Sequence, residues 1–510
     1  MAAFLLGRSD LALLSNLVGV LLIVSGFIAL IPIVVCLAFG ESFAIPGSLL
    51  TFILSVTLGA CLYVPFRQEG EIHLKHGMLA AALAWIVIPL LGAVPFVLVG
   101  NAIPPGSSLV CRMDPMEGFF ESMSGWTTTG LTMVDNEALL PASLQFWRSL
   151  TQWVGGVGVV VLSLAILARP GSGAFSLYVG EARTDKLRPR VVGTARTMLR
   201  IYLVYTCFAA VTFCLLGMPV WDSLNHAMTV LPTGGFSVRD NSIQDYGNIW
   251  VEIAVMVFMM IGAISFVVHA DMFRRRLRSL WQDAQNRALL LLVVFGAVVL
   301  TAELVSGGPT FGSLTRSARL ASFQFVSALS TTGFQTTDLR NWTPPAKILL
   351  SLAMIAGGAA GSTAGGIKLI RLILVTKGVH WEFLRTFLPK EVYVPKRVGR
   401  LTMEDREFSG IVLEAAAFSF VYLVLLVVGV LVLMSVLGSV SVVDVFFEVC
   451  SAQGTTGLSV GLVGPSMPDV AKLMLIINMY TGRLEIFPVL MLLQAFFASL
   501  HIRRRASPTP

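Results

Sequence analysis

The sequence contains few charged residues for its length. Asp, Glu, Lys and Arg make up 13% of its 510 residues, whereas hydrophobic residues make up 55% and the mean hydropathy is +0.81. A soluble domain carries about 25% charged residues and needs polar groups to cover its surface. The shortage therefore excludes a soluble globular protein and predicts a membrane protein with several spans.

Histidine and cysteine are scarce as well, with six of each. The histidines have no metal-ligand spacing, and most cysteines lie in apolar runs, so we expect no structural disulfide. The sequence also lacks an HExxH motif, an acidic catalytic motif in a loop, and a dinucleotide fingerprint placed after a strand. These absences argue against a polytopic membrane enzyme and indicate that any effect of nucleotides requires another subunit.

One loop pattern, by contrast, occurs four times. In residues 451–459, SAQGTTGLS, it directly follows the short apolar run Val440–Cys450. Each copy has a central Gly, Thr two residues before it, Ser or Thr six residues before it, and Leu or Phe just after it. The intervals of 105, 98 and 124 residues fit two membrane spans with a re-entrant segment, and they are too long for a solenoid repeat. The aligned glycines are Gly130, Gly235, Gly333 and Gly457.

Each loop lies between predicted helices, and a short segment of about 10–13 residues precedes it. At 1.5 Å per residue such a segment cannot cross a hydrocarbon core of about 30 Å. Asp114 and Pro115 supply a cap and a first-turn proline for the first short segment, and Ser441 supplies a cap for the fourth. A surface hairpin is the alternative, but four copies in register favour a re-entrant pore loop. The predicted order of helix, short segment, loop and helix is 77–100, 115–126, 127–132 and 143–168; 196–217, 220–230, 231–237 and 247–273; 286–306, 317–329, 330–335 and 345–376; and 409–437, 441–452, 453–459 and 468–500.

The predicted fold is an all-α polytopic membrane protein in which four pseudo-repeats of helix, pore loop and helix surround one pore. Two apolar helices, roughly 11–39 and 47–66, precede the first repeat and stand outside the fourfold pattern. The predicted boundaries are 1–70 for this two-helix N-terminal membrane domain and 71–180, 181–280, 281–395 and 396–510 for pore repeats 1 to 4.

The distribution of basic residues predicts the orientation. Of the 36 Lys and Arg residues, 27 lie in segments on the side away from the glycine loops. Because basic loops stay on the cytoplasmic side, the glycine loops should open outward, and ten spans place both termini in the cytoplasm. The basic loops 183–200, 274–287 and 377–406 either only anchor this topology or also dock an acidic cytoplasmic partner. The net charge of +7 therefore indicates membrane topology, and we expect no nucleic-acid partner.

Four such loops converging on one axis would form a ring of backbone carbonyl groups. A cation that loses its water there finds replacement oxygens in the ring. Glycine allows backbone angles that other residues avoid and leaves no side chain in the path, while the Thr hydroxyls add oxygens or brace the loop. One aligned glycine per loop, in place of a five-residue TVGYG run, predicts a short filter with few ion sites. The predicted ion-binding residues are Thr128, Thr129, Gly130, Thr233, Gly234, Gly235, Thr331, Thr332, Gly333, Thr455, Thr456 and Gly457.

On these residues the sequence resembles the superfamily of potassium transporters that includes TrkH, TrkG and KtrB. The resemblance covers nearly the whole chain, and the two extra helices are similar to the TrkH/TrkG branch. The family's filter glycines fall on the four aligned glycines, and Gly at position 130, where relatives that favour sodium often have Ser, resembles a potassium filter. The second loop departs from the STTGF pattern of the third, with Pro232 and Gly234.

A second unusual stretch is Gly357–Gly366, GGAAGSTAGG, which interrupts the last apolar span of the third repeat. Close packing of small residues between helices is one interpretation. A phosphate-binding loop is another, although no GKS or GKT follows. We favour an unwound intramembrane loop below the filter, because each Gly costs a helix about 1 kcal/mol relative to Ala. The stretch resembles the family's gating loop, and the residues assigned to it are Gly357, Gly358, Gly361, Gly365, Gly366 and Lys368.

Arg483 lies within the last apolar span, in the segment NMYTGRLEIF. A charged residue inside a span is costly and is usually functional. A snorkelling side chain or a local pair with Glu485 is the alternative. The family has an arginine in this motif near the pore axis, and a fixed positive charge below the filter would raise the barrier for cations. We therefore assign Arg483 to the gate.

The resemblance implies uptake of potassium across the bacterial cytoplasmic (inner) membrane, with K+ as the transported ion and no organic cofactor. Sodium-coupled or poorly selective monovalent cation uptake is the alternative, and a structural membrane scaffold would not need four matching polar loops. The family further implies a homodimer, contacts with membrane lipids, and a cytoplasmic nucleotide-binding regulatory ring protein as partner. The sequence does not indicate whether flow is passive or coupled.

Overall fold

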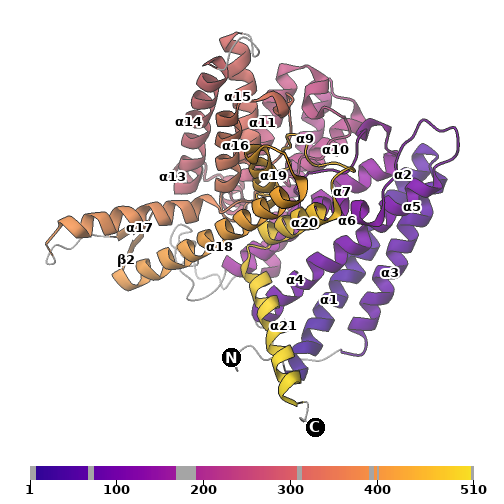
Figure 1. Ribbon diagram of the computed structural model, residues 1–510, viewed down its shortest axis with the longest axis horizontal. Coiled ribbons are helices and arrows are strands. Elements are labelled where there is room, and N and C mark those ends of the chain that lie inside the picture. The colour runs from indigo at the N-terminus through magenta and orange to yellow at the C-terminus, as the bar shows by residue number, and fades with distance from the viewer. Residues whose placement is uncertain are drawn as a thin grey trace.

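The structure is a computed structural model that describes residues 7–66, 74–167, 191–306, 313–389, 396–398 and 401–506. Within these ranges the chain is helical apart from one short antiparallel hairpin of strands β1 (Lys396–Val398) and β2 (Leu401–Met403). The all-α class is therefore confirmed. Figure 1 shows the helices gathered into one body, with α21 reaching the end of the molecule at which α1 begins.

The helices that precede the first repeat are α1 (Arg8–Ile28), α2 (Pro32–Phe39) and α3 (Ile45–Tyr63), with the short turn η2 (Ser42–Ala44) between the last two. The helices α1 and α3 approach each other closely at Gly19 and Gly59. A Cβ added at Gly19 would lie 2.7 Å from the Gly59 carbonyl oxygen, and one at Gly59 would lie 2.8 Å from the Gly19 carbonyl oxygen. Small residues at this crossing let the two backbones touch, as in other membrane helix pairs.

Four groups of helices follow in the predicted order. The bounds are α4 (Leu74–Gly92), α5 (Val94–Ala102), α6 (Pro115–Trp126), η3 (Glu137–Leu139) and α7 (Ala142–Leu167) in the first; α9 (Val191–Leu215), α10 (Val220–Val230), η4 (Ser242–Tyr246), α11 (Ile249–Ala263), α12 (Phe266–Phe273) and α13 (Arg278–Gln282) in the second; α14 (Ala284–Ser306), α15 (Leu314–Leu329), η6 (Leu339–Asn341), α16 (Pro344–Ala356) and α17 (Leu369–Phe387) in the third; and α18 (Asp405–Leu437), α19 (Val442–Gln453), α20 (Asp469–Arg483) and α21 (Phe487–Ala506) in the fourth.

The short helices α6, α10, α15 and α19 end just before the four glycine loops and have 12, 11, 16 and 12 residues. Twelve residues span about 18 Å, which is too short to cross a bilayer core. Asp114 caps α6 as predicted, and its carboxylate accepts a hydrogen bond from the Glu117 N–H. Ser441 is the N-cap of α19, but its side chain makes no capping hydrogen bond, so that part of the prediction is wrong. The helix α15 begins at Leu314, three residues before the predicted start, because Ser313 caps it.

Three of the four second helices are broken; the break in the third repeat was predicted at Gly357–Gly366, whereas continuous helices were predicted in the second and fourth repeats. The pairs α11 and α12, and α20 and α21, bend by 103° and 112°. In the third repeat, residues 357–368 separate α16 from α17. At the α20–α21 break, Glu485 and Ile486 adopt φ angles of 57° and 58°, which a helix cannot contain. Only α7 of the first repeat continues unbroken across its 26 residues.

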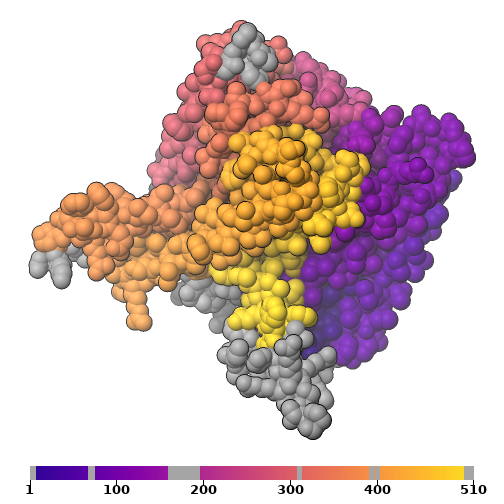
Figure 2. Space-filling view, viewed as in Figure 1, coloured from indigo at the N-terminus to yellow at the C-terminus, as the bar shows by residue number. Residues whose placement is uncertain are grey.

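Six described helical segments are long and apolar enough to cross a membrane, or eight if each bent pair is one span. The two remaining expected spans are α7, which carries Arg148 and Gln152 in its first half, and the interrupted pair α16 and α17. The chain is thus a multi-pass membrane protein, while the number of ten spans stays a prediction. Figures 1 and 2 show α17, the hairpin and the start of α18 as an arm that projects from this body.

Candidate functional site: four loops that close a ring

The four glycine loops share one backbone conformation. The Thr two residues before each aligned glycine has a positive φ, at 54°, 54°, 53° and 49° for Thr128, Thr233, Thr331 and Thr455. Residues other than Gly rarely adopt such angles, and β-branched residues almost never do. The aligned glycines follow with φ between 75° and 93°. Strain at the same position in all four copies indicates that the surrounding structure imposes this conformation for a purpose.

The hydroxyl six residues before each glycine anchors three of the loops. The Ser124, Ser327 and Ser451 hydroxyl oxygens accept hydrogen bonds from the backbone N–H groups of Gly130, Gly333 and Gly457, at 3.0, 3.1 and 3.0 Å.

The second loop differs, as its sequence suggests. The Thr229 hydroxyl donates back to helix carbonyls at Asn225 and His226, and the Gly235 N–H reaches only the Thr229 carbonyl, at 3.3 Å. This loop therefore lacks the side-chain anchor that the other three have.

The loops contact one another in cyclic order. A Cβ added at Gly130 would overlap the carbonyl oxygen of Gly234 in the second loop, and equivalent overlaps follow around the ring. Each aligned glycine thus packs against the carbonyl that precedes the aligned glycine of the next loop, and the fourth loop returns to the first. The contacts are Gly130 to Gly234, Gly235 to Thr332, Gly333 to Thr456, and Gly457 to Thr129.

Most carbonyl groups of this ring have no hydrogen-bond donor. Among the described residues no N–H or O–H group donates to the carbonyls of Thr129, Thr332 and Thr456, whereas the Gln152 side chain donates to that of Gly234 at 2.7 Å. The hydroxyls of Thr128, Thr455 and Thr456 are buried and have no partner either. Buried polar groups normally have partners. Their absence here shows that the ring holds oxygen atoms that the protein leaves free.

A second set of residues, which the sequence analysis missed, braces the segment after each loop. A polar residue lies nine positions before every aligned glycine, on the short helix, and each is fully buried. Extending the comparison of the four repeats by three residues upstream would have revealed this shared polar position. The braces are Glu121 to Thr132 and Met133, His226 to Ser237, Gln324 to Thr336, and Glu448 to Ser459, Val460 and Leu462.

A third set joins neighbouring repeats outside the loops. In each case a polar residue near the start of one repeat's second helix contacts the short helix of the next repeat, and the fourth repeat contacts the first. The contacts, at 2.7 to 3.1 Å, are Gln145 with Trp221, Glu252 with Arg319, Lys347 with Asp444, and Lys472 with Glu117.

The small-residue stretch Gly357–Gly366 is not helical, and it contacts three of the four loop regions. The Gly365 N–H donates to the Thr331 hydroxyl at 2.7 Å, and the Thr363 hydroxyl donates to the Leu231 carbonyl at 2.7 Å. A Cβ at Gly365 would overlap the carbonyl oxygen of Gly454. Only residues without a large side chain fit between these loops and the break in α16–α17.

Within the stretch, Gly357, Gly361 and Gly366 adopt positive φ angles of 70°, 74° and 76°. A Cβ at Gly358 would lie 3.0 Å from the Ala263 carbonyl oxygen, at the α11–α12 break. Lys368 ends the stretch with φ of 80°, and its buried ammonium group donates to the Ala364 carbonyl. Residues 357–368 therefore form a tightly folded, non-helical segment.

Arg483 is 3% exposed, and its Nη1 donates to the Thr363 carbonyl oxygen at 2.7 Å. Its Nε and Nη2 atoms are buried and have no partner. The alternative pair with Glu485 is not formed, because Glu485 pairs with Arg371 at 2.6 Å. The snorkelling alternative fails too, because the side chain is buried. The structure thus places Arg483 against the small-residue stretch.

Comparisons with known proteins agree over nearly the whole chain. The profile of the family described as "TrkH: Cation transport protein" matches residues 45–499. The chain is 32% identical over 511 residues to the Trk system potassium uptake protein TrkH of Halomonas elongata, covering 96% of this chain and 99% of the relative. It is 31% identical over 506 residues to an uncharacterized cation transporter of Methanocaldococcus jannaschii, covering 98% of both chains. The crystal structure of the potassium transporter TrkH from Vibrio parahaemolyticus matches with a TM-score of 0.82 at 30% identity, covering 94% of this chain and 98% of that one.

Proposed function

The chain belongs to the TrkH family of cation transport proteins, which are membrane transporters and not enzymes, and on this basis we propose that it takes up K+ through the centre of the four-loop ring. The observation that carries the proposal is the cyclic contact of the four loops, in which three of the four contact carbonyl oxygens accept no hydrogen bond among the described residues. A cation that enters such a ring exchanges water oxygens for carbonyl oxygens. The ring then acts as a selectivity filter.

The short helices support the same proposal. Their C-terminal ends directly precede the loops, and the partial negative charge of a helix C-terminus favours a cation nearby. The predicted ion-binding residues from Thr128 to Gly130, and their counterparts in the other loops, supply the carbonyls. The unpartnered hydroxyls of Thr128, Thr455 and Thr456 add three further oxygens.

We assign the gate to Gly357–Gly366, Lys368 and Arg483. The stretch packs against the loops and against Arg483, so a cation that leaves the ring on this side meets backbone and a fixed positive charge. Repulsion between like charges is strong where the dielectric is low and weak once water enters. Displacing the stretch would open the path and screen Arg483.

Poorly selective or sodium-coupled uptake is the second candidate, and the second loop favours it. Its Gly234 carbonyl already accepts a hydrogen bond from Gln152, and its Gly235 N–H lacks the hydroxyl anchor of the other loops. A ring in which one loop differs from the other three discriminates less well between K+ and Na+ than a symmetric ring does, unless other contacts fix the differing second loop.

The family membership also supports the remaining expectations. We propose that the protein lies in the bacterial cytoplasmic membrane with both termini inside, that it forms a homodimer, and that a cytoplasmic nucleotide-binding ring protein regulates it. Of the basic loops considered for docking, 183–190, 390–395 and 399–400 lie outside the described residues.

Ion flux into vesicles that contain the purified protein tests the function, with K+ and Na+ compared. We expect K+ flux in the wild type and a lower K+ to Na+ flux ratio in Gly130→Ser, because the new side chain would overlap the Gly234 carbonyl. Gly464→Ser is the matched control, since an added Cβ there meets no atom within 4 Å. Equal flux of both ions in the wild type would favour the second candidate, and an unchanged ratio in Gly130→Ser would remove Gly130 from the filter.

A further inference from the structure

We infer that Arg148 and Gln152 are specificity-determining positioning residues: they hold the second loop against the first and so set the geometry of that quarter of the ring. The inference rests on the proposed function. Both residues lie on α7, the unbroken second helix of the first repeat, and they are one helical turn apart. We call this pair the α7 brace.

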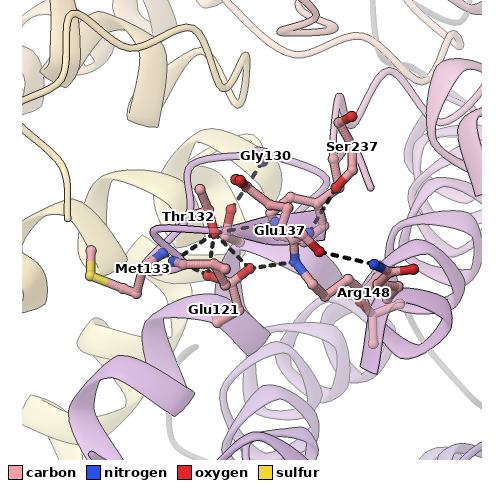
Figure 3. Close-up of polar contacts among 12 residues, drawn as sticks. Glu121, Gly130, Thr132, Met133, Glu137, Arg148 and Ser237 are labelled. Carbon is pink, nitrogen blue, oxygen red and sulfur yellow. Dashed lines mark hydrogen bonds and ion pairs between the residues drawn. The ribbon is translucent and has the colours of Figure 1, made fainter. Parts of the chain in front are cut away.

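Arg148 joins the ends of the first and second loops. Its guanidinium is 1% exposed and contacts the Glu121 carboxylate through Nε at 2.7 Å and the Thr132 hydroxyl through Nη2 at 3.2 Å. Its Nη1 donates to the Ser237 carbonyl of the second loop at 2.9 Å. Figure 3 shows Glu121, Thr132 and Ser237 gathered around this side chain. One buried residue therefore bonds to both loops.

Gln152 holds the second loop directly. Its amide nitrogen donates to the Gly234 carbonyl at 2.7 Å, and its amide oxygen accepts from the Phe236 N–H at 3.1 Å. The two bonds lie on either side of the aligned glycine, Gly235. The Arg148 guanidinium also stacks over the Phe236 ring, 4.1 Å from its centre. The two side chains of the brace therefore fix the second loop from Gly234 to Ser237.

The second loop is the one that needs such support. It lacks the hydroxyl anchor to its aligned glycine that the other three loops have. The α7 brace, which belongs to the neighbouring first repeat, supplies hydrogen bonds on either side of the aligned glycine of the second loop. Selection between ions of different size needs oxygens held in a defined arrangement, and the brace provides this arrangement where the loop's own sequence does not.

Among the described residues, the other quarters have no equivalent of this brace. Glu448 occupies the place of Glu121 in the fourth repeat, but its hydrogen bonds go only to its own loop segment, and no cation within the described ranges pairs with it. Gln324 in the third repeat bonds only to Thr336 of its own loop segment, at 3.4 Å. A bond from one loop segment to the next through an arginine is thus a feature of the first and second loops.

The test compares K+ to Na+ flux ratios of purified variants in vesicles. Arg148→Lys keeps the charge but loses the planar fork that reaches three acceptors at once, and Gln152→Met removes both bonds to the second loop. We expect each to lower the ratio about tenfold, the scale of one lost buried hydrogen bond. Should Arg148→Lys not fold, the neutral double variant Glu121→Gln with Arg148→Gln replaces it, because it buries no unpaired charge.

Arg319→Lys is the matched control. Arg319 also makes a two-bond contact with a carboxylate of a neighbouring repeat, Glu252, but within the described ranges it makes no hydrogen bond to a glycine loop. The K+ to Na+ flux ratio of Arg319→Lys should stay at the wild-type value, because losing a contact outside the loops does not change the selectivity of the molecules that fold. If the wild type prefers K+ and both brace variants keep its K+ to Na+ flux ratio, this inference is overturned while the proposed function stands. A wild type without preference for K+ would overturn the proposed function and this inference with it.

Discussion

Arg483 donates a hydrogen bond to the Thr363 carbonyl oxygen over 2.7 Å, although the two residues are 120 positions apart in the sequence. This contact joins the end of α20 to the small-residue stretch between α16 and α17. Two features that the sequence suggested separately therefore form one unit. The remaining guanidinium donors, Nε and Nη2, have no acceptor, so the positive charge is only partly compensated.

Replacing Arg483 should increase ion flux. A charge at bilayer depth costs about 2.5–3.5 kcal/mol on insertion scales, so it persists where a function offsets the cost. Arg483→Ala removes both the charge and the bond to Thr363, and it should raise K+ flux and weaken the response to a cytoplasmic regulator. Arg483→Lys should keep part of the barrier to cations, because the positive charge stays although the planar guanidinium group is lost. K+ flux through each purified variant is measured at equal amounts of protein. If both variants conduct like the wild type, Arg483 is structural.

Shortening the small-residue stretch should also increase flux. Deleting residues 359–363 removes the Thr363 bonds to Leu231 and Gly262 and the acceptor of Arg483, so the stretch can no longer press against the loops. The measurement is K+ flux from protein that elutes as a single folded species. Flux at or below the wild-type level would mean that the stretch holds the loops in place and does not occlude the path.

The contact between Lys472 and Glu117 should stabilise the protein by closing the circle of repeats. Lys472 is 2% exposed, and it donates to Glu117 at 3.1 Å and to the Pro465 carbonyl at 3.0 Å. Glu117→Gln and Lys472→Met should each lower the thermal unfolding midpoint, and together they should lower it by less than the sum, because contacting residues couple by about 0.5–3 kcal/mol. Thermal scans of the four proteins in one detergent provide the measurement. Additive losses would show that the pair contributes nothing of its own.

The protein should assemble as a dimer with two separate pores. One chain carries all four loops, and its ring closes without a second chain because Gly457 packs against the first loop. Native mass measurement should give twice the chain mass, and flux should persist in a dimer with one Gly130→Ser subunit at an intermediate selectivity. Monomers only, or a tetramer around one shared pore, would contradict this prediction.

The sequence predicted those structural features that depend on residues close together in the chain. The Asp114 cap, the four short helices and the non-helical small-residue stretch all depend on residues within one or two turns of each other. The bends at Ile264 and Glu485 were missed. Apolar composition continues through the first, and at the second the charges of Arg483 and Glu485 interrupt the apolar run without specifying a turn; both breaks lie against the small-residue stretch, which only the folded chain reveals. Contacts such as Lys472 with Glu117 join residues 355 positions apart, which no periodicity can indicate.

The last contact of the ring has a consequence for synthesis. Gly457 meets the Thr129 carbonyl, and the two residues are more than 300 positions apart, so no incomplete chain contains a closed ring. At about 5–20 residues per second, the first loop waits tens of seconds for its last neighbour. During that interval its unbonded carbonyl groups need water or the insertion machinery as a temporary partner. A chain that ends before the fourth loop therefore cannot close the ring, and its first loop keeps a carbonyl face without the neighbour against which it packs.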